Sequence, residues 1–300
     1  MTDQLTPSTG PDLGLEIRRR KRWPWLLAAA AAVVAVVGGI VYANLSHQDK
    51  PFGPNLKVAT WSTDIAAETL LGYIAENIAP DYDITIEPVQ IDNLVEINRA
   101  VDAGDVAANF FQHQPFLNDA IAANGFDLTL AVPVFTWDQA TYSDRYRSWD
   151  ELPRGAKIAL RDDPAGQAIA LLDLAEAGQI TLKPGKDTVA GLPQLTDIES
   201  NPKNYQFVQV PIGQLARSLA DVDAVVVHIS DVYAAGLTEE QILARHPAPK
   251  GSEGGLVVSN KHLGDENVQK LIAAFSDPRI GEFLETTDND LIRNTLGPIS

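Results

Sequence analysis

The sequence predicts an α/β fold that is preceded by an N-terminal transmembrane helix. From residue 56 onward, short strand-like runs alternate with segments whose apolar residues have helical spacing, and this alternation is typical of sheets covered by helices. Residues 224–229 form an almost purely apolar, β-branched run, as expected of a buried parallel strand. Ahead of this body, residues 23–43 carry no charged side chain. We therefore expect mostly parallel sheets after a membrane span.

The composition limits the classes of function. Hydrophobic residues make up 45% and charged residues 21% of the 300 residues, which is ordinary for a globular protein with a proper core. The formal net charge of -17 argues against a nucleic-acid partner, because phosphate backbones are bound by basic patches. The absence of cysteine excludes disulfides, thiolate metal ligands and a lipid-bearing cysteine.

The N-terminal segment has the charge pattern of a membrane anchor. Five consecutive basic residues at 18–22 precede the uncharged run, which would span ~30 Å as a helix, about the thickness of the hydrocarbon core. Basic residues on this flank predict a cytoplasmic tail over 1–22, a signal anchor over 23–43 and a linker over 44–55. A cleaved signal peptide is the alternative, but the run is long and no small-x-small cleavage site follows. The consecutive arginines also leave twin-arginine export open.

The body begins with regularly alternating elements. Leu70, Ile74 and Ile78 have helical spacing, residues 83–89 alternate apolar and polar like a half-buried strand, and Gly125 stops a helix. The expected strands are 56–61, 83–89, 107–111, 128–135 and 157–160, and the expected helices are 62–78, 93–103 and 115–124.

The second half of the body continues the alternation. A capping box at 238–241 predicts the start of one helix, and Pro278 is placed in the first turn of the last helix. The expected strands are 207–210, 224–229 and 255–259, and the other expected helices are 166–177, 214–220 and 267–275.

Several segments together resemble a known family. They begin with Asn109-Phe110-Phe111-Gln112-His113-Gln114-Pro115-Phe116 inside 104–117, and they continue at 148–152, 162–164, 177–183, 201–204 and 214–224. In this order and spacing they are similar to the NlpA/MetQ family of methionine-binding proteins, which are solute receptors for ABC importers. The resemblance implies a two-lobed, periplasmic-binding-protein-like fold of type II with the ligand between the lobes. Interdomain clefts and the carboxyl ends of parallel strands are favoured ligand sites.

The resemblance also implies the domain organisation and the partners. Crossings near 135–141 and 227–231 would separate lobe 1, formed by 56–135 and 230–300, from lobe 2, formed by 136–229. The protein would be a noncatalytic receptor that captures a small amino-acid-like solute, methionine or a related compound, for an ABC permease. Its body would lie outside the cytoplasmic membrane, and the signal anchor would replace the lipid anchor of the family.

Seven residues are expected to line the ligand site. Phe111, His113 and Phe116 match the family directly, and Asn98 matches more loosely. Trp137 stands where the family has a tyrosine near the first crossing, whereas Asp162 and His228 each stand where it has an asparagine. Trp61 lies where the first strand gives way to a helix, whose free backbone N–H groups suit a carboxylate.

The sequence departs from the family at the carboxylate end of the ligand. The family places an arginine on the helix after the Asp-Pro turn, and the matching residue here is Ile169, which offers no donor. An unpartnered buried carboxylate costs several kcal/mol, so His228, Arg161 or Lys157 would have to compensate. We expect an uncharged or zwitterionic ligand whose apolar part stacks on Phe111 and Trp137.

Each assignment competes with a purely structural role. Phe110 and Phe111 are strand neighbours that face opposite sides, so Phe111 is either a cleft residue or plain core. The corresponding structural roles are helix capping by His113, packing between lobes by Trp137, a buried neutral imidazole at His228, and capping of the 166–177 helix by Asp162 or Asp163, which is favoured for Asp163.

Three other functions remain open. His113, His228 and Asp162 are acceptable zinc ligands, which would make the protein a metal-binding receptor, although their spacing is not local. An enzyme, for example a hydrolase with a histidine base, is less favoured because no nucleophile elbow, Walker loop, dinucleotide fingerprint or H-E-x-x-H occurs. A receptor fold that has lost its ligand and serves as an adaptor of a membrane complex is the third.

Overall fold

The computed structural model of the chain describes residues 50–233 and 235–299. The predicted cytoplasmic tail (1–22), the predicted signal anchor (23–43) and the first half of the predicted linker (44–55) lie outside the described residues. Within the described ranges, no helix combines the length and the apolar character that crossing a bilayer requires. The described residues belong to one compact unit that begins at Asp49.

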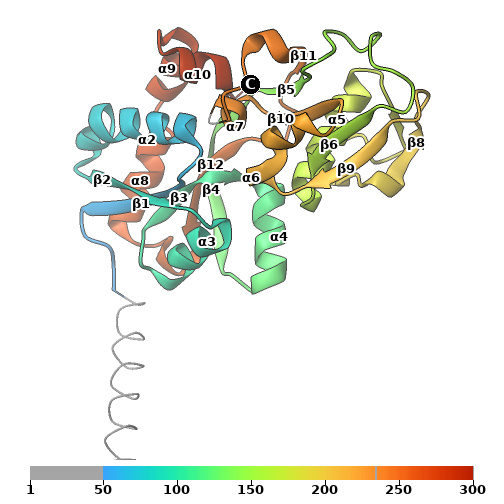
Figure 1. Cartoon of the computed structure of the whole chain (residues 1–300). Helices are drawn as coiled ribbons and strands as arrows, with labels where there is room; N and C mark the ends of the chain where they lie inside the picture. Colours follow the sequence, from blue (N-terminus) through green and yellow to red (C-terminus); the bar gives the residue numbers. More distant parts are fainter. Residues whose placement is uncertain (1–49, 234, 300) are drawn as a thin grey trace, which may run out of the picture. The chain divides into compact units, whose positions relative to one another are not determined.

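This unit is built around two mixed sheets with helices on both faces of each (Figure 1). The strands are β1 (Asn55–Trp61), β2 (Thr85–Ile91), β3 (Ala108–His113), β4 (Leu128–Trp137), β5 (Gln139–Tyr142), β6 (Lys157–Arg161), β7 (Thr181–Leu182), β8 (Ile198–Ser200), β9 (Gln206–Val210), β10 (Ala224–His228), β11 (Ile242–His246), β12 (Gly254–Ser259) and β13 (Leu296–Pro298). The helices are α2 (Ile65–Asn77), α3 (Leu94–Ala103), α4 (Gln114–Asn124), α5 (Pro164–Glu176), α6 (Ile212–Leu215), α7 (Ile229–Tyr233), α8 (Glu266–Phe275), α9 (Arg279–Thr286) and α10 (Asp290–Thr295).

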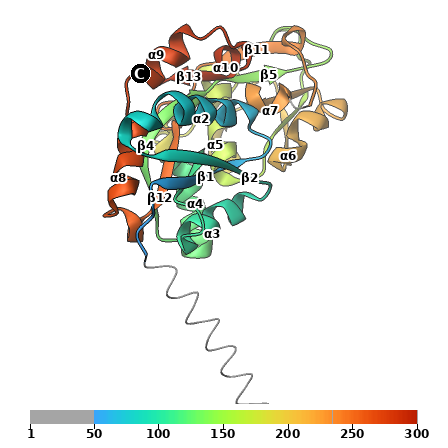
Figure 2. The ribbon, with the colours of Figure 1, turned by 90° about the vertical axis from the view of Figure 1, so that its left-hand side faces the viewer.

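The first sheet has the strand order β13-β4-β12-β3-β1-β2. One face packs against α2, α8 and α9 through a large apolar core, and the other packs against α3 and α4 through a second cluster. In Figure 2, α2 lies on one side of β1 and β2 and α3 lies on the other. Phe110 points into the first core, where it meets Phe135 and Phe275 edge-on, and Phe111 points to the opposite side. The prediction that these two neighbours face opposite sides of the sheet is confirmed.

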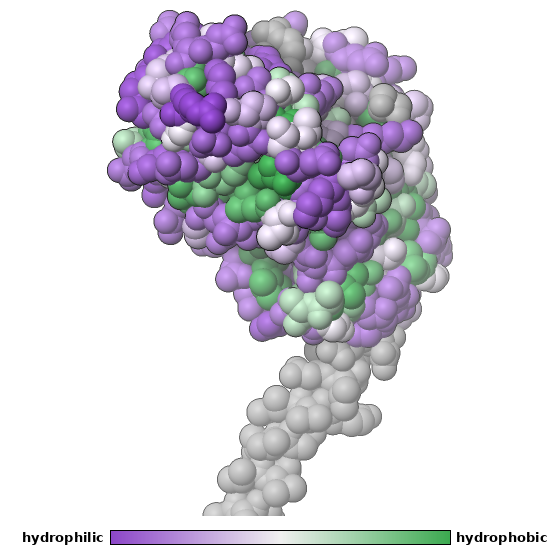
Figure 3. All heavy atoms as spheres, turned by 90° about the vertical axis from the view of Figure 1, so that its right-hand side faces the viewer, coloured by the Kyte–Doolittle hydropathy of each residue, from purple (hydrophilic) through white to green (hydrophobic). Residues whose placement is uncertain are grey.

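The second sheet has the strand order β11-β5-β10-β6-β9. The α5 helix covers one face, and α6, α7 and the short turn that follows α6 cover the other. The two sheets with their helices form the two lobes, the first on the left and the second on the right of Figure 1. On the face seen from the right-hand side of Figure 1, hydrophilic residues dominate and apolar residues form separate patches (Figure 3).

The expectation of mostly parallel sheets is wrong. Strand β1 runs parallel to β2 and β3, and β6 runs parallel to β9 and β10, but β12, β13, β5 and β11 all pair antiparallel. The buried strand predicted at 224–229 is β10, which is parallel to one neighbour and antiparallel to the other. Burial on both faces, rather than parallel pairing alone, explains its apolar sequence.

Several predicted boundaries differ from the structure, and two of these differences have a clear local cause. The capping box at Thr238 is present, but it starts only a 3-10 turn over Glu239–Gln241, after which the chain enters β11. Pairing with β5 therefore overrides the local helix signal. The helix expected from residue 62 begins at Ile65, because Asp64 is its N-cap and accepts a hydrogen bond from the Ala67 N–H.

The chain passes directly from one sheet to the other at two places. The first is Asp138, which alone separates β4 from β5. The second is 247–253, between β11 and β12, and not 227–231 as expected. The lobe boundaries at 56–135 with 230–300 and at 136–229 stay a prediction, but β11 falls inside the range expected for lobe 1 and hydrogen-bonds into the second sheet.

Candidate ligand-binding site

The main pocket lies where strands from both sheets end. Trp61 is the last residue of β1, His113 of β3, Trp137 of β4, Arg161 of β6 and His228 of β10, and all five line one pocket. The remaining lining residues are Asp64, Leu94, Phe111, Gln112, Phe116, Ile212, Ser230 and Asp231. Carboxyl ends of parallel strands are where open α/β sheets bind ligands, and β1 with β3 and β6 with β10 follow this rule.

Four strand-to-helix junctions supply the polar groups of the pocket. Asp64 caps α2 after β1, and His113 caps α4 after β3 by accepting the Phe116 N–H at Nδ1 over 3.2 Å. Asp163 caps α5 after β6, as favoured from the sequence, by accepting the Gly166 N–H over 2.8 Å. The α7 helix follows β10 and carries Ser230 and Asp231. The caps satisfy helix ends and also set the side chains around the pocket.

Aromatic rings form the walls. Trp137 packs edge-on against His113, Phe135 and His228, with ring centroids 6.1, 4.6 and 5.4 Å away. Phe111 meets Phe116 edge-on at 6.0 Å. The indole Nε1 of Trp137 donates to Asp64 Oδ2 over 3.0 Å, which fixes the ring plane. These rings give the pocket an apolar surface with a defined shape.

A glycine makes room for Trp137. A side chain at Gly254, the first residue of β12, would overlap the six-membered part of the indole. The neighbouring Gly255 lies at an irregularity in the pairing with β4, where a Cβ would overlap the Val132 carbonyl oxygen. Glycine at both positions is therefore required by close approach.

Arg161 presents a buried guanidinium to the pocket. Its Nε donates to Asp163 Oδ2 over 2.6 Å, and the whole residue is 8% exposed. Its guanidinium carbon lies 5.8 Å from the centre of the Phe116 ring, across the lobes. Within the described part of the chain, neither of its terminal Nη groups donates a hydrogen bond to protein. The free Nη groups of this guanidinium suit an anionic partner.

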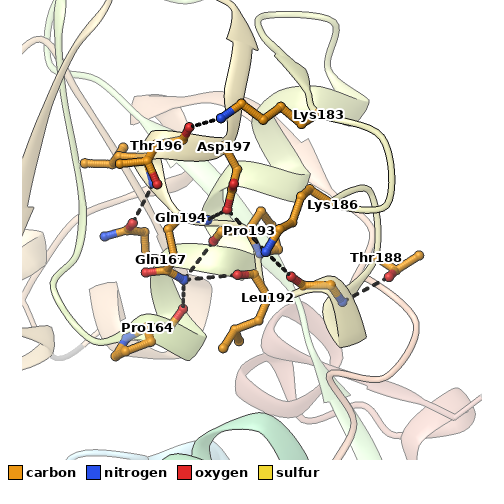
Figure 4. A network of polar contacts seen from close by, with 12 residues as sticks. Pro164, Gln167, Lys183, Lys186, Thr188, Leu192, Pro193, Gln194, Thr196 and Asp197 are labelled. Carbon is orange, nitrogen blue, oxygen red and sulfur yellow. Dashed lines mark hydrogen bonds and ion pairs between the residues drawn. The ribbon is translucent and has the colours of Figure 1, made fainter.

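A polar network joins the first turn of α5, near Arg161, to the loop over 183–197 (Figure 4). The Gln194 side-chain amide donates to the carbonyl oxygens of Pro164, Leu192 and Pro193, and the Leu195 N–H donates to Gln167 Oε1 over 2.9 Å. The loop is thereby fastened to the first turn of α5, next to the residues that hold Arg161.

The two imidazoles in the pocket are neutral. Burial, reinforced by the positive charge of Arg161, lowers the pKa of His113 to about 4. The same two causes, and then His113 itself, place the pKa of His228 well below its ordinary value. His228 is 9% exposed, and its Nδ1 has no hydrogen-bond partner among the described residues. Neutral imidazoles both donate and accept.

The carboxyl groups of Asp64 and Asp231, which line the pocket, both have pKa values above the ordinary value of an aspartate. Burial raises the pKa of Asp64, and its bonds from Ala67 and Trp137 only partly oppose this. Burial and then the nearby Asp64 raise the pKa of Asp231 to about 7, against the opposing charge of Arg161. The pocket therefore contains acids whose ionisation is disfavoured when nothing neutralises them.

The space inside the pocket is small in this structure. About 40 Å³ is open to the centre of a water molecule, which corresponds to about three waters at ~10–15 Å³ each. A second hollow adjoins it, sharing Trp61, Ile212 and Asp231 and adding Arg217 among its lining residues. A ligand of amino-acid size thus requires the lining side chains or the lobes to move apart.

Six of the seven predicted site residues meet in this pocket: Trp61, Phe111, His113, Phe116, Trp137 and His228. Asp162 does not join them, because its side chain is exposed and does not line the pocket. The expected structural roles are present as well: His113 and Asp163 cap helices, Trp137 packs against His228 across the lobes, and His228 is a buried neutral imidazole. Ile169, at the family's arginine position, is buried within α5 and does not line the pocket.

Sequence reasoning missed Asp64, Ser230 and Asp231 and named Arg161 only as a possible replacement. Arg161 is the last residue of a strand, and the other three lie within three residues after a strand end. This position relative to strand ends is the sequence signal that would have identified them. Asn98 lies one layer behind the pocket: with Asn109 it hydrogen-bonds Gln112, which does line it. The expectation attached to Trp61 was that free N–H groups at the start of the next helix would receive the ligand. In the structure, Asp64 accepts one of these, the Ala67 N–H.

The model of the NlpA lipoprotein family matches residues 56–294. The chain belongs to this family. Among curated family members, the D-methionine-binding lipoprotein MetQ of Escherichia coli (strain K12) is 32% identical over 257 residues, covering 84% of this chain and 92% of that protein. Membership makes the chain a substrate-binding protein and not an enzyme.

Solved structures of NlpA-like proteins share the fold. A nutrient binding protein from Burkholderia cenocepacia bound to methionine matches with a TM-score of 0.70 and 28% identity, covering 82% of this chain and 100% of that one. A periplasmic substrate-binding protein of an ABC transporter from Coxiella burnetii matches with a TM-score of 0.71 and 25% identity, covering 81% and 100%. The two-lobed, periplasmic-binding-protein-like fold expected for this family member is thereby confirmed for the body.

Proposed function

We propose that this NlpA-family chain is the extracytoplasmic substrate-binding component of an ABC importer, and that it captures a small zwitterionic solute with an apolar part. Methionine or a related amino acid is the expected class, as in the relatives described above. The observation that carries the proposal is the pair of Arg161 Nη groups, which have no protein partner within the described residues and belong to an aromatic pocket at converging strand ends.

Arg161 replaces the missing arginine of the family in this proposal. Its two Nη groups offer a planar fork that fits a carboxylate, and Asp163 holds Nε so that the fork has a fixed direction. The carboxylate of the solute would bind there, while its apolar part would stack on Phe111 and Trp137. Burial of a carboxylate against Arg161 removes the cost that Ile169 alone would leave.

The location outside the membrane follows from the N-terminal sequence. We propose that residues 23–43 remain as an uncleaved anchor, tethering the receptor beside its permease and raising its effective concentration there. The expected result is that the full chain stays in the membrane after alkaline carbonate washing and that externally added protease digests its body. Release of a shortened chain into the medium would contradict the anchor while leaving the binding function open.

The solute can be found without prior assumption. Mass spectrometry of small molecules that co-purify with the full chain is expected to detect an amino acid or a close derivative. In a Phe111→Ala, Trp137→Ala double variant the same molecule is expected to be lost, because both apolar walls are removed. Unchanged affinity in the double variant would refute this placement of the ligand.

The metal-receptor alternative receives no support from the geometry. Asp162, one of its three expected ligands, is exposed and outside the pocket. Across residues 50–233 and 235–299, no group of three or more His, Cys, Asp or Glu side chains is arranged to hold a metal ion. Calorimetry with zinc is expected to give no specific binding signal.

A further inference from the structure

We propose that Asp231, supported by Asp64, forms an ammonium subsite, so that tight binding requires a protonated amine on the ligand. This inference rests on the proposed function, because it concerns the same pocket. It adds a second point of recognition beside Arg161 and names the chemical group that the ligand must carry there.

The first support is the set of polar atoms without partners. Three buried side-chain atoms that lack any hydrogen bond within the described residues belong to residues lining the pocket: Asp231 Oδ2, Ser230 Oγ and His228 Nδ1. Ser230 is 5% exposed and His228 is 9% exposed, so water reaches them poorly. Such atoms normally have partners. An ammonium group supplies N–H donors of the kind that such acceptors lack.

The second support is the balance of charge. The guanidinium of Arg161 is paired through Nε with Asp163. Asp64 accepts hydrogen bonds from the Ala67 N–H and from Trp137 Nε1, but both donors are uncharged. Among the described residues that line the pocket, Arg161 is the one cation, and Asp163 already balances its charge, so Asp231 and Asp64 add two acidic groups in excess. Buried charges without a counter-ion are strongly disfavoured, so a cationic ligand group stabilises the pair.

The third support is the shape of the walls. The Trp137 ring is fixed by its bond to Asp64 and stands against His228, and Trp61 and Asp231 line both adjoining hollows. Aromatic faces attract an ammonium group through their quadrupole. The rings therefore favour the cation that the carboxyl groups require and disfavour an N-acylated ligand, which is neutral there and larger.

The subsite makes binding depend on pH. The described groups around Asp231 are Asp64 from the start of α2, Arg161 from β6, His228 from β10 and His113 from β3, and α10, which packs against α7, carries Asp290. The pKa of Asp231 is about 7 in the empty pocket, whereas that of His113 is about 4 and that of His228 is well below its ordinary value. Asp231 must ionise to accept an ammonium, so affinity rises as the pH rises through about 7.

Calorimetry on the full-length chain with three probes tests the subsite. The probes are racemic methionine, its N-acetyl derivative and its decarboxylated amine. At pH 8 we expect the N-acetyl derivative to bind about 30-fold or more weakly than methionine, because a buried charge interaction is lost. The amine should still bind, but more weakly than methionine, because it lacks the carboxylate that contacts Arg161. Between pH 8 and pH 6 the affinity for methionine should fall by about tenfold, since the ionised fraction of Asp231 falls by that factor.

Two variants separate the subsite from general effects. Asp231→Asn keeps the shape of the side chain and is expected to weaken methionine by about 30-fold or more, to leave the N-acetyl derivative unchanged and to abolish the pH dependence. Asp162→Asn, which changes an exposed acid outside the pocket, is the matched control and should change none of these values. If Asp231→Asn does not fold, the comparison of probes on the native chain decides alone.

The outcomes are distinct. The inference is overturned if the N-acetyl derivative binds the native chain as tightly as methionine, if Asp231→Asn binds methionine normally, or if none of the three probes binds at pH 8. The proposed function falls only if a wider panel of amino acids, short peptides and organic anions also gives no binding. Binding of an organic anion without an amine would keep the receptor and reject the ammonium subsite.

Discussion

At the scale of single residues, the side chain of Asp163 and the absence of a side chain at Gly166 together fix the direction of one guanidinium. Asp163 accepts the Gly166 N–H with one carboxylate oxygen and the Arg161 Nε–H with the other. A Cβ on Gly166 would overlap Nε, Cδ and Cβ of Arg161. The absence of a side chain at Gly166 is therefore what lets the arginine lie across the start of α5.

We expect Gly166→Ala to displace Arg161 and to weaken methionine binding by at least about tenfold, because a charge-assisted hydrogen bond is worth ~1.5–3 kcal/mol. Calorimetry measures the affinity. Gly72→Ala is the control: it also lies inside a helix, but a Cβ there meets no atom within 4 Å, so affinity should stay constant. Equal affinity in both variants would show that Arg161 has no part in binding.

A buried acid on α5 predicts a pH dependence of stability. Asp173 is fully buried, neither of its carboxylate oxygens has a hydrogen-bond partner within the described residues, and burial raises its pKa well above the ordinary value, with Glu176 adding to this. Because its folded-state pKa exceeds the unfolded value, the folded state binds the proton more tightly. Stability is therefore lost as the pH rises above about 4.

The variant Asp173→Asn removes this ionisation. At pH 8 it should raise the free energy of unfolding by an amount on the order of 1–3 kcal/mol, because the variant no longer has a carboxyl whose charged form is disfavoured by burial. The gain should shrink as the pH falls toward 4. Urea denaturation at several pH values measures this, with the exposed Asp221→Asn as control. A gain that is equal at every pH would contradict the assigned protonation.

At the scale of elements, the site is made by strand ends and the helices that follow them. The loop over 183–197 adds a brace to the first turn of α5 (Figure 4). One amide, that of Gln194, makes three of the contacts, so the brace depends strongly on a single side chain.

We expect Gln194→Ala to loosen this loop by about 1 kcal/mol or more, because the carbonyl of Pro164 loses a donor. Hydrogen exchange followed by mass spectrometry should show faster exchange across 186–197 while the strands of the second sheet stay protected. Gln206→Ala, on the exposed edge strand β9, is the control and should leave the loop unchanged. Protection of 186–197 equal to that of the native chain would contradict the brace.

The elements also show what the sequence can and cannot predict. The strand and helix segments near Trp61, His113 and Arg161 follow from local patterns, and the aromatic site residues follow from the family resemblance. Strand β5 lies where the sequence predicts a crossing, because its four residues become a strand only through β10 and β11. Asp231 was missed for a similar reason: sequence places it after a strand but gives no distance to Asp64.

At the scale of the whole body, the two lobes are held together at the pocket itself. Phe116 from the first lobe faces Arg161 from the second, and Trp137 faces His228 in the same way. Asp138 links the sheets, accepting the Ile229 N–H and donating its own N–H to the Thr295 carbonyl. A solute bound among these groups contacts both lobes at once.

We therefore expect methionine to stabilise both lobes as one cooperative unit. At a free concentration one hundred times the Kd, the free energy of unfolding should rise by about 2.7 kcal/mol, seen in calorimetric scans as one transition moving to higher temperature. The Phe111→Ala, Trp137→Ala variant should show no such shift. Two separate transitions, of which methionine moves only one, would show that the lobes unfold independently.

The positions of the indole rings give the body an optical property. Of the five tryptophans in the chain, Trp23 and Trp25 precede the body, and two of the remaining three line the pocket, where Trp137 donates to a carboxylate and Trp61 donates to the Asp92 carbonyl. Ultraviolet emission from the described region thus originates largely at the place where a solute would arrive. We therefore expect the wavelength and intensity of tryptophan emission to report whether the pocket is occupied by a solute, without an added dye.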